Sequence, residues 1–185
     1  MPRLFIALRP PADVRDLLID TMEGLDGARW QDEGQLHVTL RFAGEMDVHR
    51  ADDLADALAA IRANGFSIAV AGTGFFEKKG VVTSIWARIA PSPELQRLQR
   101  RVERACIAAG LEPETRAFCP HVTLARLNRS SDPAGDWLAR NALLKSRTWE
   151  VPSFALYESK LSPSGSLYEA VVHYPLQRSV PDVPA

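Results

Sequence analysis

Long apolar runs and cysteine pairs are both missing from this sequence of 185 residues. A transmembrane helix needs roughly 18 or more consecutive apolar residues. No stretch approaches that length, so we expect no membrane-spanning segment. The first apolar run, Leu4 to Leu8, is too short for a secretory signal. The chain has two cysteines, Cys106 and Cys119, which are too few for a disulfide framework. We therefore expect reduced thiols in a cytoplasmic protein.

An excess of charge of one sign is missing as well. Lys and Arg number 22 against 23 Asp and Glu, which gives a formal net charge of −1. A protein that coats nucleic acid needs a broad basic surface, so this class is not expected, although a local phosphate site remains allowed. The composition is 46% hydrophobic and 24% charged, as in ordinary globular proteins. The length allows one or two domains.

Segments with the two-residue period of strands alternate with segments of helical period. Strands are expected over residues 4–8, 36–43, 66–71, 81–89, 121–127, 149–159 and 167–174, and helices over 12–24, 47–63, 93–109 and 132–144. Residues 75–80 resemble the polar tip of a hairpin, and the helical stripe of 93–109 places Cys106 in the core. This order favours one α+β domain over residues 1–176, built of two similar halves, followed by a disordered tail over 177–185.

One tetrapeptide occurs twice. His37-Val38-Thr39-Leu40 recurs 84 positions later as His121-Val122-Thr123-Leu124, although the chain has only four histidines. Both copies lie in predicted strands, where successive side chains point to opposite faces. Each His therefore shares a face with its Thr, while Val and Leu point to the other face. Packing alone gives no reason for histidine twice at the same phase.

Two imidazoles facing one cleft suit a paired general base and general acid, because their ordinary pKa lies near neutrality. Threonine hydroxyls can donate hydrogen bonds to phosphoryl oxygens, and Arg126 adds a permanent positive charge that suits an anion. Arg41 follows Thr39 by two residues, so a regular strand would place both on one face. A solvated or salt-bridged side chain is the preferred interpretation of Arg41.

These motifs resemble those of the 2H phosphoesterase family, named for two H-x-[TS]-x motifs, and most closely its bacterial and archaeal RNA 2′,3′-cyclic phosphodiesterases, also called 2′-5′ RNA ligases. The resemblance covers nearly the whole chain outside the tail. It runs through Arg3 to Leu8, Leu36 to Glu45, Ser84 to Ile89, Phe118 to Arg126 and the strands between Tyr157 and Leu176.

The resemblance implies a bilobal α+β fold of two pseudo-symmetric lobes, each an antiparallel sheet with outer helices, around a central cleft. It implies hydrolysis of an RNA-terminal or nucleotide 2′,3′-cyclic phosphate to a 2′-phosphate without metal or cofactor, and 2′-5′ ligation by some members. Carried over by position, His121 is the base and His37 the acid, Thr39 and Thr123 are phosphate donors, and Arg126 contacts the phosphate.

The resemblance also makes Phe5 and Phe42 candidates for a nucleoside pocket, although core packing is the favoured interpretation of both. Other functions stay open. A zinc site could be built from His37, His121, Cys119 and His173, but structural zinc sites normally show closely spaced pairs on short loops. The cleft could bind a nucleotide without turnover, or act on another cyclic phosphate or a 2′-5′ oligonucleotide. We expect a monomer.

Overall fold

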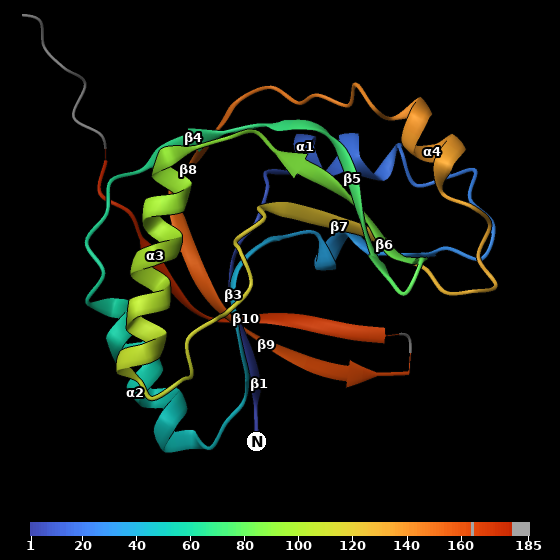
Figure 1. The fold of residues 1–185 in the computed structure, drawn as a ribbon. Helices are drawn as coiled ribbons and strands as arrows, with labels where there is room; N and C mark the ends of the chain where they lie inside the picture. The colour runs from blue at the N-terminus through green and yellow to red at the C-terminus, as the bar shows by residue number, and fades with distance from the viewer. Residues whose placement is uncertain (164, 179–185) are drawn as a thin grey trace, which may run out of the picture.

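The computed structural model describes residues 1–163 and 165–178 (Figure 1). The N-terminal part contains β1 (Arg3–Leu8), α1 (Ala12–Ile19), β2 (Arg29–Trp30), the 3-10 helix η1 (Glu33–Gln35), β3 (Val38–Glu45), α2 (Val48–Ala59), β4 (Phe66–Ile68), β5 (Val70–Lys78) and β6 (Val81–Ile89). The C-terminal part contains α3 (Pro93–Ala108), β7 (His121–Arg126), α4 (Gly135–Arg140), β8 (Trp149–Val151), β9 (Ser153–Ser162) and β10 (Gly165–Pro175).

The main sheet of the described residues has eight antiparallel strands in two groups. Its order is β10-β9-β1-β3-β7-β6-β5, with the short β2 also paired to β7. Strands β4 and β8 form a separate two-stranded sheet. The lobe of β10, β9, β1 and β3 meets the lobe of β7, β6, β5 and β2 through the pairing of Val38 with Val122. This arrangement confirms the expected bilobal α+β fold.

Both central strands carry a β-bulge at the same place in the repeated tetrapeptide. The register of β3 against β1 slips by one residue after Thr39, and the register of β7 against β6 slips by one residue after Thr123. Leu40 and Leu124 are the extra residues. A bulge of one residue reverses the side-chain phase of the strand beyond it. Phe42 and Arg126, which follow these extra residues, therefore face the side opposite to that expected for a regular strand.

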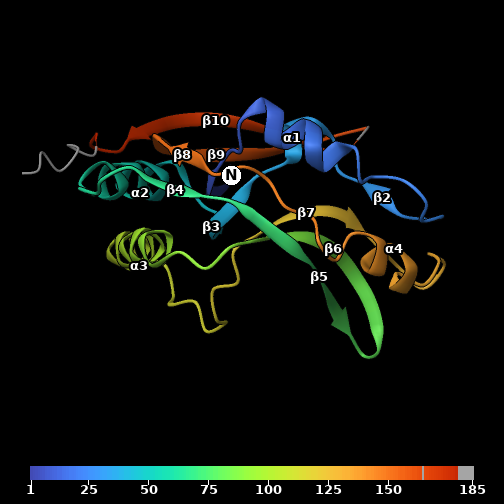
Figure 2. The ribbon, with the colours of Figure 1, turned by 90° about the horizontal axis from the view of Figure 1, so that it is seen from above.

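Helices pack at the ends of the sheet and close the core. Helices α2 and α3 lie side by side at one end of the molecule, and α4 lies at the other (Figures 1 and 2). Helix α3 begins at the cap Ser92, whose hydroxyl accepts a hydrogen bond from the backbone N–H of Leu95. Its buried stripe includes Cys106, and burial raises the pKa of this thiol to about 12. The expectation of a core cysteine is confirmed.

Several predicted boundaries were wrong. Helix α1 ends at Ile19 rather than residue 24, because the chain turns there and Gly24 and Gly27 adopt positive φ. Helix α4 covers only 135–140 of the predicted 132–144. The segment 75–78 belongs to β5, and the hairpin turns at Lys79 and Gly80, both with positive φ. The predicted strands 66–71 and 149–159 are each divided between the two sheets, and β2 and η1 were not predicted.

The end of the chain is described as far as residue 178. Gln177, the first residue of the predicted tail 177–185, forms a bridge with Asn64, and its N–H donates to the carbonyl of Ala63. Residues 179–185 lie outside the described residues. None of the helices in the described part of the chain is long and apolar enough to cross a membrane.

Candidate active site

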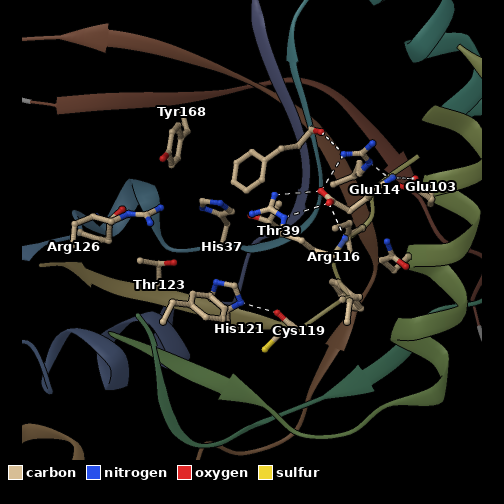
Figure 3. A pocket seen from close by; sticks show the side chains of 18 residues that line it. His37, Thr39, Glu103, Glu114, Arg116, Cys119, His121, Thr123, Arg126 and Tyr168 are labelled. Carbon is tan, nitrogen blue, oxygen red and sulfur yellow. Dashed lines mark hydrogen bonds and ion pairs between the residues drawn. The ribbon is translucent and has the colours of Figure 1, made fainter. Parts of the chain in front are cut away.

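A cavity of about 540 Å³ lies between the two lobes (Figure 3). It is lined by all five of the predicted site residues and by side chains from β5, α3, β10 and the loops before β3 and β7. The lining comprises Gln31, His37, Thr39, Leu40, Arg41, Phe42, Phe76, Gln99, Glu103, Glu114, Arg116, Ala117, Phe118, Cys119, His121, Thr123, Arg126 and Tyr168. The fold thus brings the two copies of the repeat into one cleft.

The contact between the lobes determines how the repeats face each other. Because Val38 lies opposite Val122 in an antiparallel pair, the same register sets His37 beside Thr123 and Thr39 beside His121. The two copies are thereby related by a local pseudo-two-fold axis. Figure 3 shows these four side chains directed toward one space. A small anion placed there can contact both imidazoles and both hydroxyls.

Each imidazole is held by the same hydrogen bond. His37 Nδ1 lies 2.5 Å from the carbonyl oxygen of Gln35, and His121 Nδ1 lies 2.6 Å from that of Cys119. A carbonyl only accepts, so Nδ1 carries the proton in both rings. Nε2 is then the atom that changes protonation, as an acceptor in neutral imidazole and a donor in imidazolium. Both rings are therefore arranged to transfer protons through Nε2.

Aromatic rings support His37 from its own lobe. Its ring centroid lies 4.9 Å from that of Phe5 and 5.2 Å from that of Tyr168, in an edge contact with the latter. Phe5 is only 2% exposed and stacks on Tyr157, so the core interpretation of Phe5 is correct. Tyr168 was not identified from the sequence, because only the pairing of β10 with β9 and of β9 with β1 brings it there.

The other lobe supports His121 in the same way. The ring of His121 lies 5.0 Å from Phe76 in an edge contact and 5.2 Å from Trp86. Trp86 can lie there because its cross-strand partner Gly74 has no side chain: a Cβ on Gly74 would fall 2.3 Å from the indole. Neither Phe76 nor Trp86 was identified from the sequence as part of the site, because only the pairing of β5 with β6 and of β6 with β7 brings them to His121.

Burial and positive neighbours keep both imidazoles neutral at neutral pH. The pKa of His37 is lowered to about 4, chiefly by burial and also by the charges of His121 and Arg126, against the opposing effect of the Gln35 hydrogen bond. Burial also lowers the pKa of His121, with Arg126 contributing. A bound anion would reverse the electrostatic contribution and raise both values. The general acid and general base expected from the sequence therefore need an anion in the cleft, because the acid must be protonated while the base is neutral.

The bulges decide which side chains complete the cleft. In a regular strand Arg126, five residues after His121, would face away from it, but the extra residue Leu124 returns Arg126 to the cleft. The equivalent position in β3, after the extra residue Leu40, is Phe42, which lines the cleft and is 55% exposed. The core interpretation of Phe42 is wrong for this reason. Pseudo-symmetry thus sets an arginine and an aromatic ring at equivalent positions.

Comparison with known proteins agrees with this geometry. The model of the 2'-5' RNA ligase superfamily matches residues 10–162. The chain belongs to the 2'-5' RNA ligase superfamily. The resemblance expected from the two motifs is confirmed.

Two relatives of similar sequence are named RNA 2',3'-cyclic phosphodiesterase. The protein from Aeropyrum pernix is 33% identical over 163 residues, which cover 86% of this chain and 91% of that protein. The protein from Geobacillus stearothermophilus is 30% identical over 159 residues, which cover 85% of this chain. The chain spans about half the length of that second relative, because the match covers 50% of it.

Solved structures of similar fold include one from Thermus thermophilus. It is 26% identical, with a TM-score of 0.79, and the match covers 96% of this chain and 100% of that one. Escherichia coli LigT, crystallised with 3'-AMP, has the same TM-score at 23% identity, with 95% of this chain and 99% of LigT covered. LigT supports the assignment of the fold alone.

An ion-pair network centred on Arg41 forms another wall of the cleft. Its Nε lies 2.7 Å from Glu103 of α3, and its guanidinium also donates to the carbonyl of Glu112 and to the carboxylate of Glu114. The salt-bridged interpretation of Arg41 is correct. Glu103 in turn accepts a hydrogen bond from the Glu114 backbone N–H. Arg41 thus connects β3 to the loop that leads into His121.

The remaining candidates for metal ligands do not come together. Cys119 lines the cleft beside His121, but His173 lies exposed on β10 and outside the cleft lining. Residues 1–163 and 165–178 contain no group of three or more His, Cys, Asp or Glu side chains that could hold a metal ion. The set of four ligands imagined from the sequence is therefore not assembled in this fold.

We expect Arg41→Ala to reduce the free energy of unfolding by about 3 kcal/mol, because it leaves the carboxylate of Glu103 largely buried without its partner. The Arg41 and Glu103 side chains are 11% and 18% exposed. Arg97→Ala is the control: its pair with Glu94 is about half exposed, so the change should stay within about 0.5 kcal/mol. Urea unfolding measures both, and equal stability of the two variants would contradict the assigned role.

Proposed function

We propose that this protein hydrolyses the 2′,3′-cyclic phosphate of an RNA end or a nucleotide to a 2′-phosphate, without a metal or cofactor. The observation that carries the proposal is the pair of imidazoles, His37 and His121, each held at Nδ1 and facing one cleft with two threonines and Arg126. The two relatives from Aeropyrum pernix and Geobacillus stearothermophilus, both named RNA 2',3'-cyclic phosphodiesterase, support the same substrate class. The activity is that of an RNA 2′,3′-cyclic 3′-phosphodiesterase.

In the proposed reaction, Nε2 of His121 accepts a proton from water while the water oxygen attacks phosphorus. The bond from phosphorus to the ribose O3′ breaks, and His37 donates the proton on its Nε2 to O3′. The product keeps the phosphate on O2′ and regains a 3′-hydroxyl. Thr39, Thr123 and Arg126 donate hydrogen bonds to the non-bridging oxygens, where negative charge accumulates in the transition state.

Two observations support the roles of the groups. Burial lowers the pKa of His37 to about 4 in the free enzyme, and a bound phosphate would raise it, so the protonated ring that acts as the acid forms with the substrate in place. The guanidinium of Arg126 makes no hydrogen bond or ion pair with the described residues, so it is available to an anion. In-line attack and departure then use the two opposite sides of the cleft, one imidazole on each side.

The exposed ring of Phe42 supports a place for the nucleobase. It lines the same cavity as the motifs and as the loop residues Phe118 and Cys119. Bases stack on aromatic side chains with little dependence on their identity. We propose that the terminal base stacks on Phe42, while the phosphate lies between the histidines. This arrangement places ribose between the two groups.

The same proposal includes the domain organisation, cellular compartment and oligomeric state of the enzyme. Residues 1–176 would act as one bilobal domain, as the shared sheet supports. The two free thiols, buried Cys106 and exposed Cys119, are consistent with a reducing compartment such as the cytoplasm. A monomer suffices, because both motifs of the cleft come from one chain. Reversible 2′-5′ ligation would be the same chemistry with an RNA 5′-hydroxyl in place of water.

The deciding experiment compares hydrolysis of nucleoside 2′,3′-cyclic phosphates and of a short RNA with a 2′,3′-cyclic end. His37→Ala and His121→Ala should each lose at least about 100-fold in kcat, because each removes one proton-transfer group. His49→Ala, at an exposed position of α2, is the control and should retain full activity. Exhaustive EDTA treatment should leave the wild-type rate unchanged.

Other outcomes of this experiment favour different functions. Tight nucleotide binding by the wild type with no turnover would indicate a binding module. Turnover restricted to another cyclic phosphate or to 2′-5′ oligonucleotides would assign a different substrate. Loss of activity in EDTA that zinc restores would contradict the metal-free mechanism.

The dependence of kcat/KM on pH should reflect the ionisation of both His37 and His121. The value of kcat/KM reports on the free enzyme, in which the pKa of both rings lies below the ordinary 6.5. One ring is protonated and the other neutral only between these lowered values. We therefore expect a bell-shaped profile of kcat/KM with its maximum below pH 6.5. Arg126→Gln removes a neighbouring positive charge and should move the bell to higher pH. A maximum above 6.5 in the wild type would contradict this electrostatic account.

Phe42→Ala should raise KM for a nucleoside cyclic phosphate about tenfold, because stacking of one base contributes about 1–3 kcal/mol. The rate kcat should change little, since the ring does not contact the phosphate. Phe75→Ala is the control, because Phe75 is 45% exposed but does not line the cleft. Steady-state kinetics of both variants test this prediction. An unchanged KM in Phe42→Ala would contradict stacking of the base on Phe42.

A further inference from the structure

A second arginine lies beside Arg126 at the edge of the cleft. The short strand β2 pairs with β7 in such a way that Arg29 lies directly opposite Arg126 and Trp30 opposite Ala125. Directly opposite residues of an antiparallel pair point to the same face, with Cβ atoms about 5 Å apart. Arg126 faces the cleft, so Arg29 extends from the same face just outside it.

The neighbours of Arg29 agree with this orientation. Trp30 points the other way, into the core, where its ring lies 6.2 Å from that of buried Trp137. Gln31, one residue further, lines the cleft and donates its N–H to the carbonyl of Leu124. Alternation along an extended segment therefore sets Arg29 and Gln31 on the cleft side and Trp30 on the core side.

The charges of the two arginines are not compensated within the protein. Like charges directly opposite each other across two strands are destabilising. Neither Arg29 nor Arg126 has a hydrogen bond or ion pair from its side chain to residues 1–163 or 165–178. Other arginines around the cleft are paired, Arg41 with Glu103 and Arg116 with Glu114. Two adjacent unpaired guanidinium groups thus form a site for two neighbouring anionic groups.

We propose that Arg29 binds the phosphate on the 5′ side of the terminal nucleotide, while Arg126 holds the reacting cyclic phosphate. This inference rests on the proposed function and narrows its substrate class. The preferred substrates are 2′,3′-cyclic ends whose terminal nucleotide also carries a phosphate on its 5′ side, as in an RNA strand. Successive phosphates of a strand are the neighbouring anions that such a pair of guanidinium groups fits. The net charge of −1 fits as well, because two local contacts replace a broad basic surface.

The test compares adenosine 2′,3′-cyclic phosphate with the same compound carrying a 5′-phosphate and with the dinucleotide ApA ending in a 2′,3′-cyclic phosphate. In the wild type, the two substrates with a 5′-phosphate group should have about tenfold higher kcat/KM, the gain of one charge-assisted hydrogen bond. Arg29→Gln should abolish this preference and leave the kinetics of the substrate without a 5′-phosphate unchanged. Arg29→Lys should keep part of the preference.

A matched control and the salt dependence sharpen the result. Arg104→Gln removes an exposed arginine of α3 outside the cleft lining and should keep the full preference. For the dinucleotide, the slope of log kcat/KM against log salt should be steeper by about 0.7 in the wild type than in Arg29→Gln. Equal kcat/KM of the wild type with and without the 5′-phosphate, or an equal loss on all substrates in Arg29→Gln, would overturn the proposal.

Binding of product analogues separates this proposal from the proposed function. Calorimetry of adenosine 2′-phosphate and adenosine 2′,5′-bisphosphate needs no turnover. The wild type should bind the bisphosphate about tenfold more tightly, and Arg29→Gln should bind both alike. Equal affinity of the wild type for both would overturn the role of Arg29. Tighter binding of the bisphosphate without any hydrolysis of cyclic phosphates would support Arg29 and contradict the enzyme.

Discussion

The antiparallel contact between Val38 and Val122 is the constraint on which the site depends. Both side chains are fully buried, so the contact is part of the core as well as the junction of the two lobes. Because it pairs the second residue of each repeat, it sets each histidine beside the threonine of the other copy. A register shift of one residue would turn one motif away from the cleft. Only this pairing of the two repeats places both histidines and both threonines in one cleft.

Approximate symmetry then supplies two similar imidazoles, and local departures from symmetry give them different surroundings. Each ring is held by a carbonyl at Nδ1 and supported by two aromatic rings from its own lobe. The bulges after the two threonines present Phe42 on one side and Arg126 on the other. An apolar platform and a cation at equivalent positions suit the two ends of a nucleotide, its base and its phosphate.

Electrostatics make the cleft receptive to an anion. Both imidazole pKa values are lowered by burial, and Arg126 contributes an uncompensated charge. A phosphate entering the cleft would relieve the repulsion among these groups and favour protonation of one ring. Substrate binding and the preparation of the acid are then the same event. The pairing of Arg41 with Glu103 keeps a further cation from competing for that phosphate.

The sequence by itself determined the parts of the site that are local. The repeat, the alternation of His with Thr, the core stripe of α3 and the fold class could all be read from residue types and spacing. The tertiary structure alone decided the phase of Arg126 and Phe42, because a bulge depends on the register against a neighbouring strand. It alone placed Tyr168 against His37 and Arg29 against Arg126. Such contacts join segments far apart in the chain, and pairing between strands, which no local pattern specifies, creates them.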